Sequence, residues 1–105
     1  MLIAQFEPGT DDVHYCKPTS VAVSRDGQTF YVADGYCNSR IIKYGLSVDP
    51  GTGYHKVTKL TSWGQPNSPQ VLTSKSPYAL NIPHGLALAE SLGMICVADR
   101  ENGRV

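Results

Sequence analysis

The sequence lacks an excess of charge, a long hydrophobic run and any leader-like start. Its nine basic residues balance nine acidic ones among 105 residues, so no net field favours nucleic acid or an anionic membrane as a partner. No apolar stretch approaches the roughly 20 residues needed to cross a bilayer, which predicts no membrane segment in this chain. Residues 1–7 lack the basic region and the apolar core of a secretory signal. We therefore expect any such signal to lie upstream of Met1.

Helical periodicity is missing as well, and β-strand patterns take its place. Apolar side chains alternate with polar or small ones in residues 19–24, Asp26 and Gly27 supply a tight turn, and a return strand follows. A second turn is predicted at residues 49–53 from its proline and glycine content. Residues 64–76 are rich in Pro, Ser, Gln and Asn, which is typical of a surface loop. The predicted strands are residues 19–24, 29–33, 40–44 and 57–63, with a short fifth strand at residues 70–72.

The chain also matches itself at a nearly constant offset, which indicates an internal repeat. In each copy an aspartate, Asp34 or Asp99, ends the second strand of a hairpin. Such an aspartate can accept backbone N–H bonds at the turn, and the Asn-x-Arg that follows fixes the crossing to the next strand. The matched segments are residues 18–23 with 83–88, 32–34 with 97–99, and 38–41 with 102–105.

The repeat predicts the fold. A unit of about four short antiparallel strands is the outline of a propeller blade, and a blade buries its faces only against neighbouring blades. We therefore expect an all-β fragment, about two blades, of a β-propeller. Blade one would span residues 14–63, a loop insert residues 64–79, and a truncated blade two residues 80–105. The alternative architecture is a small β-sandwich with coincidental hairpins.

The three cysteines carry information about the compartment. Cys16 precedes the first strand and Cys37 follows the second, and a hairpin brings such positions back towards each other. A disulfide there would contribute roughly 3 kcal/mol and would indicate an oxidising compartment. The alternative is three reduced thiols in a cytosolic propeller. Cys96 makes the number of cysteines odd, so we expect its disulfide partner to lie outside this stretch.

Two signatures resemble a known family. Residues 34–41 (Asp-Gly-Tyr-Cys-Asn-Ser-Arg-Ile) and residues 96–104 (Cys-Val-Ala-Asp-Arg-Glu-Asn-Gly-Arg) closely resemble peptidyl-α-hydroxyglycine α-amidating lyase, the lyase domain of peptidylglycine α-amidating monooxygenase. Residues 14–19 and 82–88 fit the same family in the same order. The resemblance is weakest between residues 48 and 79. It implies a six-bladed NHL-type propeller that cleaves the N–C bond of a C-terminal α-hydroxyglycine, giving a peptide amide and glyoxylate.

The resemblance also implies roles for individual residues. His84, in a Pro-His motif, matches one of three histidines that hold a catalytic zinc, and the other two lie outside this chain. Tyr36 matches the general base that takes the hydroxyl proton. Arg100 matches an active-site arginine, which favours the phenolate or binds the substrate carboxylate. Without the resemblance, these residues would be interpreted as a structural turn histidine, a packed aromatic and a surface ion-pair former.

Further expectations follow from the same resemblance. Cys16 pairs with Cys37, and Cys96 pairs with a cysteine two residues beyond Val105. The implied cofactors are zinc and a structural calcium bound by other blades. The implied partners are a peptidyl-α-hydroxyglycine substrate, in peptide-hormone maturation, and a linked copper monooxygenase domain. The implied location is the secretory granule lumen or the extracellular space. We expect the fragment alone to be inactive.

A different class of function remains as the alternative, namely a non-catalytic NHL-repeat propeller that binds protein or RNA. A binding module has no reason to combine Tyr36, His84 and Arg100 in these signatures. An RNA-binding propeller would also be expected to show a basic face, which the balanced charge does not favour.

Overall fold

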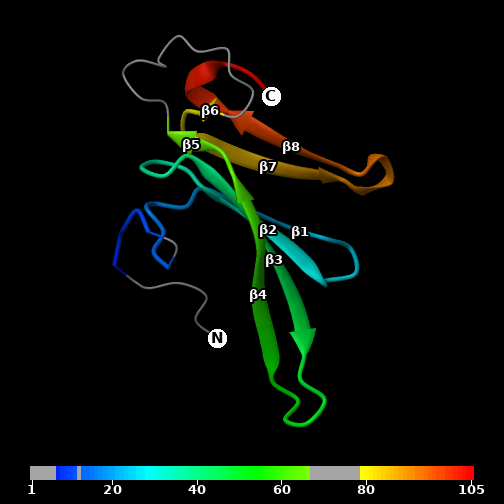
Figure 1. The fold of residues 1–105 in the computed structure, drawn as a ribbon. Helices are drawn as coiled ribbons and strands as arrows, with labels where there is room; N and C mark the ends of the chain where they lie inside the picture. The colour runs from blue at the N-terminus through cyan, green and yellow to red at the C-terminus, as the bar shows by residue number, and fades with distance from the viewer. Residues whose placement is uncertain (1–6, 12, 67–78) are drawn as a thin grey trace.

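The computed structural model describes residues 7–11, 13–66 and 79–105, and this part of the chain is built from strands and two short 3-10 helices (Figure 1). The all-β expectation is confirmed. The strand predicted at residues 70–72 lies outside the described residues. The elements are β1 (Ser20–Val23), β2 (Thr29–Asp34), β3 (Arg40–Val48), β4 (His55–Trp63), β5 (Gln65–Pro66), β6 (Ala79–Leu80), β7 (Pro83–Ala89), η2 (Glu90–Leu92), β8 (Met94–Asp99) and η3 (Arg100–Asn102).

Strands β1 to β4 form one antiparallel sheet in chain order, the layout of a propeller blade. The predicted first turn forms because Gly27 adopts a left-handed φ of 71° and the Asp26 carboxylate accepts the backbone N–H of Gln28 at 2.9 Å. The third and fourth strands are longer than predicted. The register pairs Thr29 with Gly45, so the rest of the β3–β4 hairpin extends past β2 (Figure 1).

The first sheet buries a different apolar cluster on each face, because strand side chains alternate. One cluster contains Val32, Ile42 and Tyr44. The other contains Ala33, Ile41 and Leu80, with apolar side chains of β7 and β8 packed against it. Ile41 and Ile42 are fully buried, and each such side chain stabilises the fold by about 1.5–3 kcal/mol. The second cluster therefore joins the first sheet to the β7–β8 hairpin.

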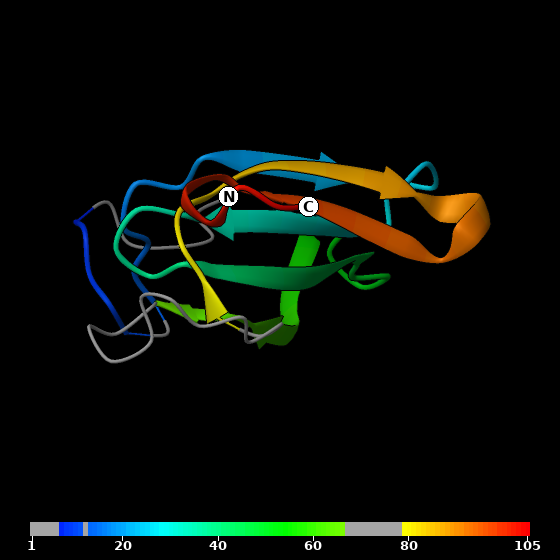
Figure 2. The same ribbon diagram turned by 90° about the horizontal axis from the view of Figure 1, so that it is seen from above.

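The β7–β8 hairpin repeats the pairing of β1 and β2. Val21 pairs with Val32 in the first hairpin, and Leu86 pairs with Val97 in the second, each residue 65 positions after its counterpart. Figure 2 shows β1 and β7 side by side, so the two copies are neighbours in space. The repeat found in the sequence is thus a structural repeat. The blade limits at residues 14–63, 64–79 and 80–105 stay predictions.

A further short sheet lies between the repeats, where β5 and β6 pair in parallel. Ala79 and Leu80 of β6 are buried, which anchors the start of the second repeat against the first sheet. Among the residues that the structure describes, no helix has the length and apolar character needed to cross a membrane.

Candidate functional site

The turn of the first repeat is organised around a buried carboxylate, Asp34. Its Oδ1 accepts the backbone N–H of Cys16 at 2.7 Å. Its Oδ2 accepts from the amide of Asn38 at 2.7 Å and from Nε of Arg40 at 2.9 Å. These charge-assisted bonds satisfy the carboxylate and fix the loop between β2 and β3. The turn role predicted for Asp34 is therefore confirmed.

The second repeat uses the same arrangement around Asp99. Its Oδ1 accepts the backbone N–H of Asn81 at 2.7 Å. Its Oδ2 accepts from Asn102 at 2.7 Å and from Nε of Arg104 at 2.9 Å. The donors occupy the positions equivalent to those around Asp34, so the two loops that follow β2 and β8 are held in the same way.

Each of these loops is also tied to the segment that precedes its hairpin. In the first repeat the tie is covalent, since Cys16 and Cys37 form a disulfide with their Cα atoms 5.3 Å apart. In the second repeat the equivalent positions are Asn81 and Glu101, where the backbone N–H of Glu101 donates to the carbonyl of Asn81 at 3.0 Å. The predicted disulfide is confirmed, and the alternative of three reduced thiols is wrong.

His84 lies at an irregular point of β7. The pairing passes from Pro83 opposite Asp99 to Gly85 opposite Ala98, so His84 is the additional residue of a β-bulge. A bulge changes the direction of a side chain and is common beside functional sites. Ile82, two residues earlier, has a φ of 57°, which is unusual for a β-branched residue. The backbone around His84 therefore departs from regular strand geometry at two points, the left-handed Ile82 and the bulge at His84 itself.

These loops and the bulge bring Tyr36, His84 and Arg100 together. The Oη atom of Tyr36 lies 3.4 Å from Nε2 of His84, and the two rings meet edge to face with centroids 6.0 Å apart. A terminal nitrogen of Arg100 donates to the same Oη at 3.4 Å, and the guanidinium lies 5.6 Å from the centre of the tyrosine ring. All three side chains are exposed, so a ligand from solvent can reach them.

Glu101 is a member of this cluster that the sequence analysis missed. Its Oε1 accepts from Nε of Arg100 at 2.8 Å, which leaves a terminal nitrogen of the guanidinium directed at Tyr36. Hydrogen bonds to Glu101 first, and to Tyr36 second, raise the pKa of Arg100 above its ordinary value. An acidic residue directly after Arg100 was the available signal, but adjacency in sequence does not by itself predict a side-chain contact.

The comparison with protein families bears on both repeats. The NHL repeat matches residues 15–44 and 80–105, which is more than half of the chain. The chain belongs to the NHL repeat family. The predicted repeat architecture is confirmed, and the β-sandwich alternative is wrong.

Similar proteins carry names from one enzyme family. The chain is 41% identical over 99 residues to mouse peptidyl-glycine alpha-amidating monooxygenase, an alignment that covers 94% of this chain and 9% of the mouse protein. It is 43% identical to a probable peptidyl-alpha-hydroxyglycine alpha-amidating lyase of Caenorhabditis elegans, covering 93% and 24% of the two chains. It is 44% identical to peptidyl-alpha-hydroxyglycine alpha-amidating lyase 1 of Drosophila melanogaster, covering 95% and 17%. The resemblance is therefore confirmed, although the chain spans less than a quarter of each of these relatives.

Metal-binding side chains are sparse in this part of the NHL propeller. Within residues 7–11, 13–66 and 79–105, no group of three histidine, cysteine or acidic residues is arranged to hold a metal ion. His84 has an exposed imidazole that fits one zinc ligand, and a site of three histidines would need two more from elsewhere in the protein.

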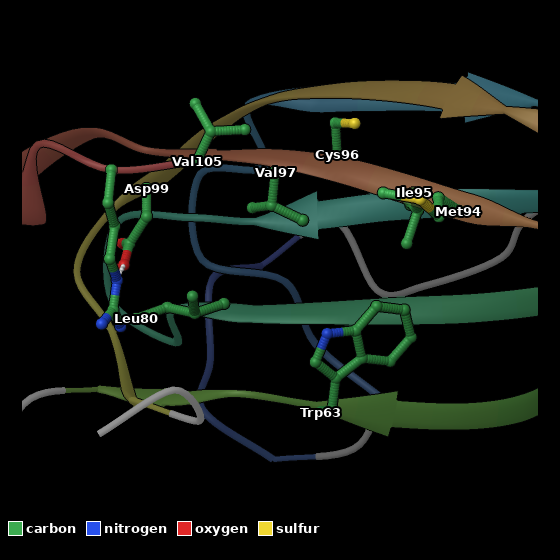
Figure 3. Close-up of a pocket in the computed structure, with 9 residues that line it drawn as sticks. Trp63, Leu80, Met94, Ile95, Cys96, Val97, Asp99 and Val105 are labelled. Atoms are coloured by element: carbon green, nitrogen blue, oxygen red, sulfur yellow. Dashed lines mark hydrogen bonds and ion pairs between the residues drawn. The ribbon is translucent and has the colours of Figure 1, made fainter. Parts of the chain in front are cut away.

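A cavity lies away from the Tyr36 cluster, between the end of β4 and β8. It has a volume of about 410 Å³ and is lined mainly by apolar side chains, with Trp63 facing Ile95 and Val97 across it (Figure 3). Cys96 and Val105 point to the opposite side of β8 in the same view. The cavity lies beside one edge of β8. In the first NHL repeat, β3 pairs along the corresponding edge of β2. Its apolar walls are suited to strand packing and offer little to orient a polar substrate.

Cys96 makes no disulfide with another described residue, and its thiol is half-buried. An antiparallel bridge between Asp99 and Arg104 sets the register in which the chain returns along β8. Continuing that register places the position two residues beyond Val105 opposite Cys96. The pairing predicted for Cys96 is consistent with this register and stays a prediction.

Proposed function

We propose that this chain is part of a peptidylamidoglycolate lyase, which converts a peptidyl-α-hydroxyglycine into a peptide amide and glyoxylate. The observation that carries the proposal is the convergence of Tyr36, His84 and Arg100 from two NHL repeats. Relatives whose names state this activity are 43% and 44% identical to the chain. The proposal concerns the full-length protein, and we expect this stretch alone to be inactive.

Tyr36 is proposed as the general base. Its oxygen is within 3.4 Å of both an imidazole and a guanidinium, and it is open to solvent, so a substrate hydroxyl can approach it. The positive charge of Arg100 stabilises negative charge that develops in the transition state. The alternative role for Arg100 is to bind the carboxylate of the hydroxyglycine with both terminal nitrogens.

His84 is proposed as one of three histidine ligands of a zinc ion, with the other two supplied by other blades. Three neutral imidazoles leave an open coordination position, where a bound zinc ion would lower the pKa of a substrate hydroxyl. The proposed structural calcium would also use residues of other blades.

The proposed reaction needs no external oxidant or reductant. The hydroxyl proton passes to the oxygen of Tyr36, and the electron pair of the O–H bond becomes the second bond of the glyoxylate carbonyl. The C–N bond breaks with its electron pair moving to nitrogen. That nitrogen takes up the proton from the oxygen of Tyr36, which restores the base, and becomes the primary amide of the peptide. The sum of the products equals the substrate, as a lyase reaction requires.

The location and the partners are proposals of the same kind. The disulfide between Cys16 and Cys37 supports an oxidising compartment, and we propose the secretory granule lumen or the extracellular space. The mouse relative is named as a monooxygenase, and the worm and fly relatives are named as lyases. We propose a linked copper monooxygenase domain as a partner, with a separate lyase as the alternative arrangement.

The proposal is tested with the full-length protein that contains this chain. Glyoxylate release is measured from a synthetic N-acyl-α-hydroxyglycine, and bound zinc is measured by atomic absorption. We expect His84→Ala to lose both zinc and activity, because one ligand of three is removed, while His55→Ala on the exposed part of β4 retains both. A folded parent protein that releases no glyoxylate would contradict the proposal and favour the binding-module alternative.

A further inference from the structure

The shortest side-chain hydrogen bond between the segments that carry Tyr36 and His84 comes from the hydroxyl of Thr19. Thr19 Oγ1 donates to the carbonyl of Pro83 at 2.6 Å, across 64 positions of sequence. The backbone N–H of Thr19 donates to the carbonyl of Ala33 at 2.8 Å, which fixes Thr19 at the end of the first hairpin. The hydroxyl therefore connects the hairpin that leads to Tyr36 with the residue directly before His84.

The two backbones have no free space between them at this point. A Cβ atom added to Gly35 would lie 2.6 Å from the carbonyl oxygen of Pro83 and 2.8 Å from the methyl group of Thr19. Pro83 is itself fully buried. Since Gly35 precedes Tyr36 and Pro83 precedes His84, the segments that carry the two side chains are in direct contact.

His84 lies at the β-bulge, where regular pairing with β8 is interrupted. Its position therefore depends on contacts from the first repeat. The side-chain hydroxyls of two residues in the first repeat form hydrogen bonds with the backbone just before His84. Thr19 binds the carbonyl of Pro83, and Ser39 Oγ accepts the backbone N–H of Ile82 at 3.3 Å. The bond from Thr19 is the shorter, and it is made to the residue adjoining His84.

We propose that Thr19 is a positioning residue that sets the spacing between Tyr36 and His84. It touches neither the proposed base nor the proposed metal ligand, and it acts through the carbonyl of Pro83. The effect on kcat can be measured only if the proposed function holds, so that part of the inference rests on it. The effect on the distance between Tyr36 and His84 is independent of that function.

The test compares three variants of the full-length protein. Thr19→Val keeps the shape of the side chain and removes the donor, and Thr19→Ser keeps the donor. Ser20→Ala is the matched control, because Ser20 Oγ also joins the repeats by accepting the N–H of Leu86 at 3.2 Å. Removing a hydrogen bond that orients a metal ligand typically costs about 10- to 100-fold in metal affinity or activity. We expect Thr19→Val to lower kcat by roughly 10-fold with little change in KM, Thr19→Ser to restore most of it, and Ser20→Ala to leave kcat unchanged.

Crystal structures of the parent protein and of Thr19→Val supply the second readout. We expect the distance between Tyr36 Oη and His84 Nε2 to increase beyond its present 3.4 Å in the variant. If the unmodified parent protein releases no glyoxylate, the proposed function fails, and this distance still tests the inference. An unchanged distance in Thr19→Val would overturn the inference. So would a fall in kcat for Ser20→Ala as large as that for Thr19→Val.

Discussion

Replacing Asp34 with asparagine should destabilise the protein severely, although the two side chains have nearly the same shape. The carboxylate is fully buried and accepts three hydrogen bonds, from Cys16, Asn38 and Arg40. An asparagine with its oxygen in the place of Oδ2 can keep the bonds from Asn38 and Arg40 but loses the negative charge that pairs with the guanidinium. Its NH2 group would then face the backbone N–H of Cys16, which is itself a donor.

The equivalent residue of the second repeat supplies a comparison within the same protein. The side chains of Asp34 and Arg40 are 0% and 12% exposed, whereas those of Asp99 and Arg104 are 3% and 32% exposed. Removing one partner of a buried pair costs about 3–5 kcal/mol, and we expect Asp34→Asn to fall in that range. Water can reach Arg104 more easily, so Asp99→Asn should cost about 1–3 kcal/mol.

Urea unfolding of the full-length protein, followed by circular dichroism, measures both values. Asp26→Asn in the exposed turn after β1 is the control and should change the midpoint little. A cost below about 1 kcal/mol for Asp34→Asn would refute the reasoning, because it would fall below the cost expected for a buried pair. A larger cost for Asp99→Asn than for Asp34→Asn would refute it as well.

Three other predictions concern the loops around the site. Replacing both Cys16 and Cys37 by serine should cost about 3 kcal/mol in urea unfolding, and an unchanged midpoint would show that the disulfide contributes nothing. Gly35→Ala should cost about 1–3 kcal/mol, because its Cβ would lie 2.6 Å from Pro83 O, and calorimetry showing no lower melting temperature would contradict this contact. Burial first, and a hydrogen bond to another tyrosine second, raise the pKa of Tyr15 above its ordinary value of 10.0. The stabilisation from neutral Tyr15 is therefore complete below pH 10 and is lost as the pH rises further, and Tyr15→Phe should flatten this alkaline part of the stability curve.

The sequence predicted the fold well where one face of a strand is buried. The alternation around Val21 and Val32 located the first hairpin, and the same pattern around Leu86 and Val97 revealed its copy. The turn predicted at residues 49–53 is confirmed, but the adjoining strand residues 45–48 and 55–56 were missed because this part of the hairpin extends past β2 and its side chains are largely exposed. A hydrophobic pattern exists only where burial imposes one, so an exposed hairpin gives little signal.

The sequence singled out Tyr36, His84 and Arg100 as candidates, but it did not predict the geometry that brings them together. The shared pattern is interrupted by Tyr36, two residues after Asp34, and by Arg100, directly after Asp99, and this interruption is visible in the sequence. The bulge at His84 and the left-handed backbone of Ile82 depend on contacts between the repeats, which no local pattern encodes. The bond from Thr19 to the backbone before His84 was missed for the same reason.

The central claim is that two NHL repeats assemble a lyase site around the oxygen of Tyr36. The most direct measurement is the rate of glyoxylate release by the full-length protein carrying Tyr36→Phe, which removes that oxygen and keeps the ring. Tyr54→Phe, at a tyrosine that is 76% exposed in the β3–β4 turn, is the matched control. Loss of a general base typically costs about 10²- to 10⁴-fold, so we predict at least a 100-fold lower kcat for Tyr36→Phe and an unchanged kcat for Tyr54→Phe. Equal rates for Tyr36→Phe and the unmodified protein would contradict the account.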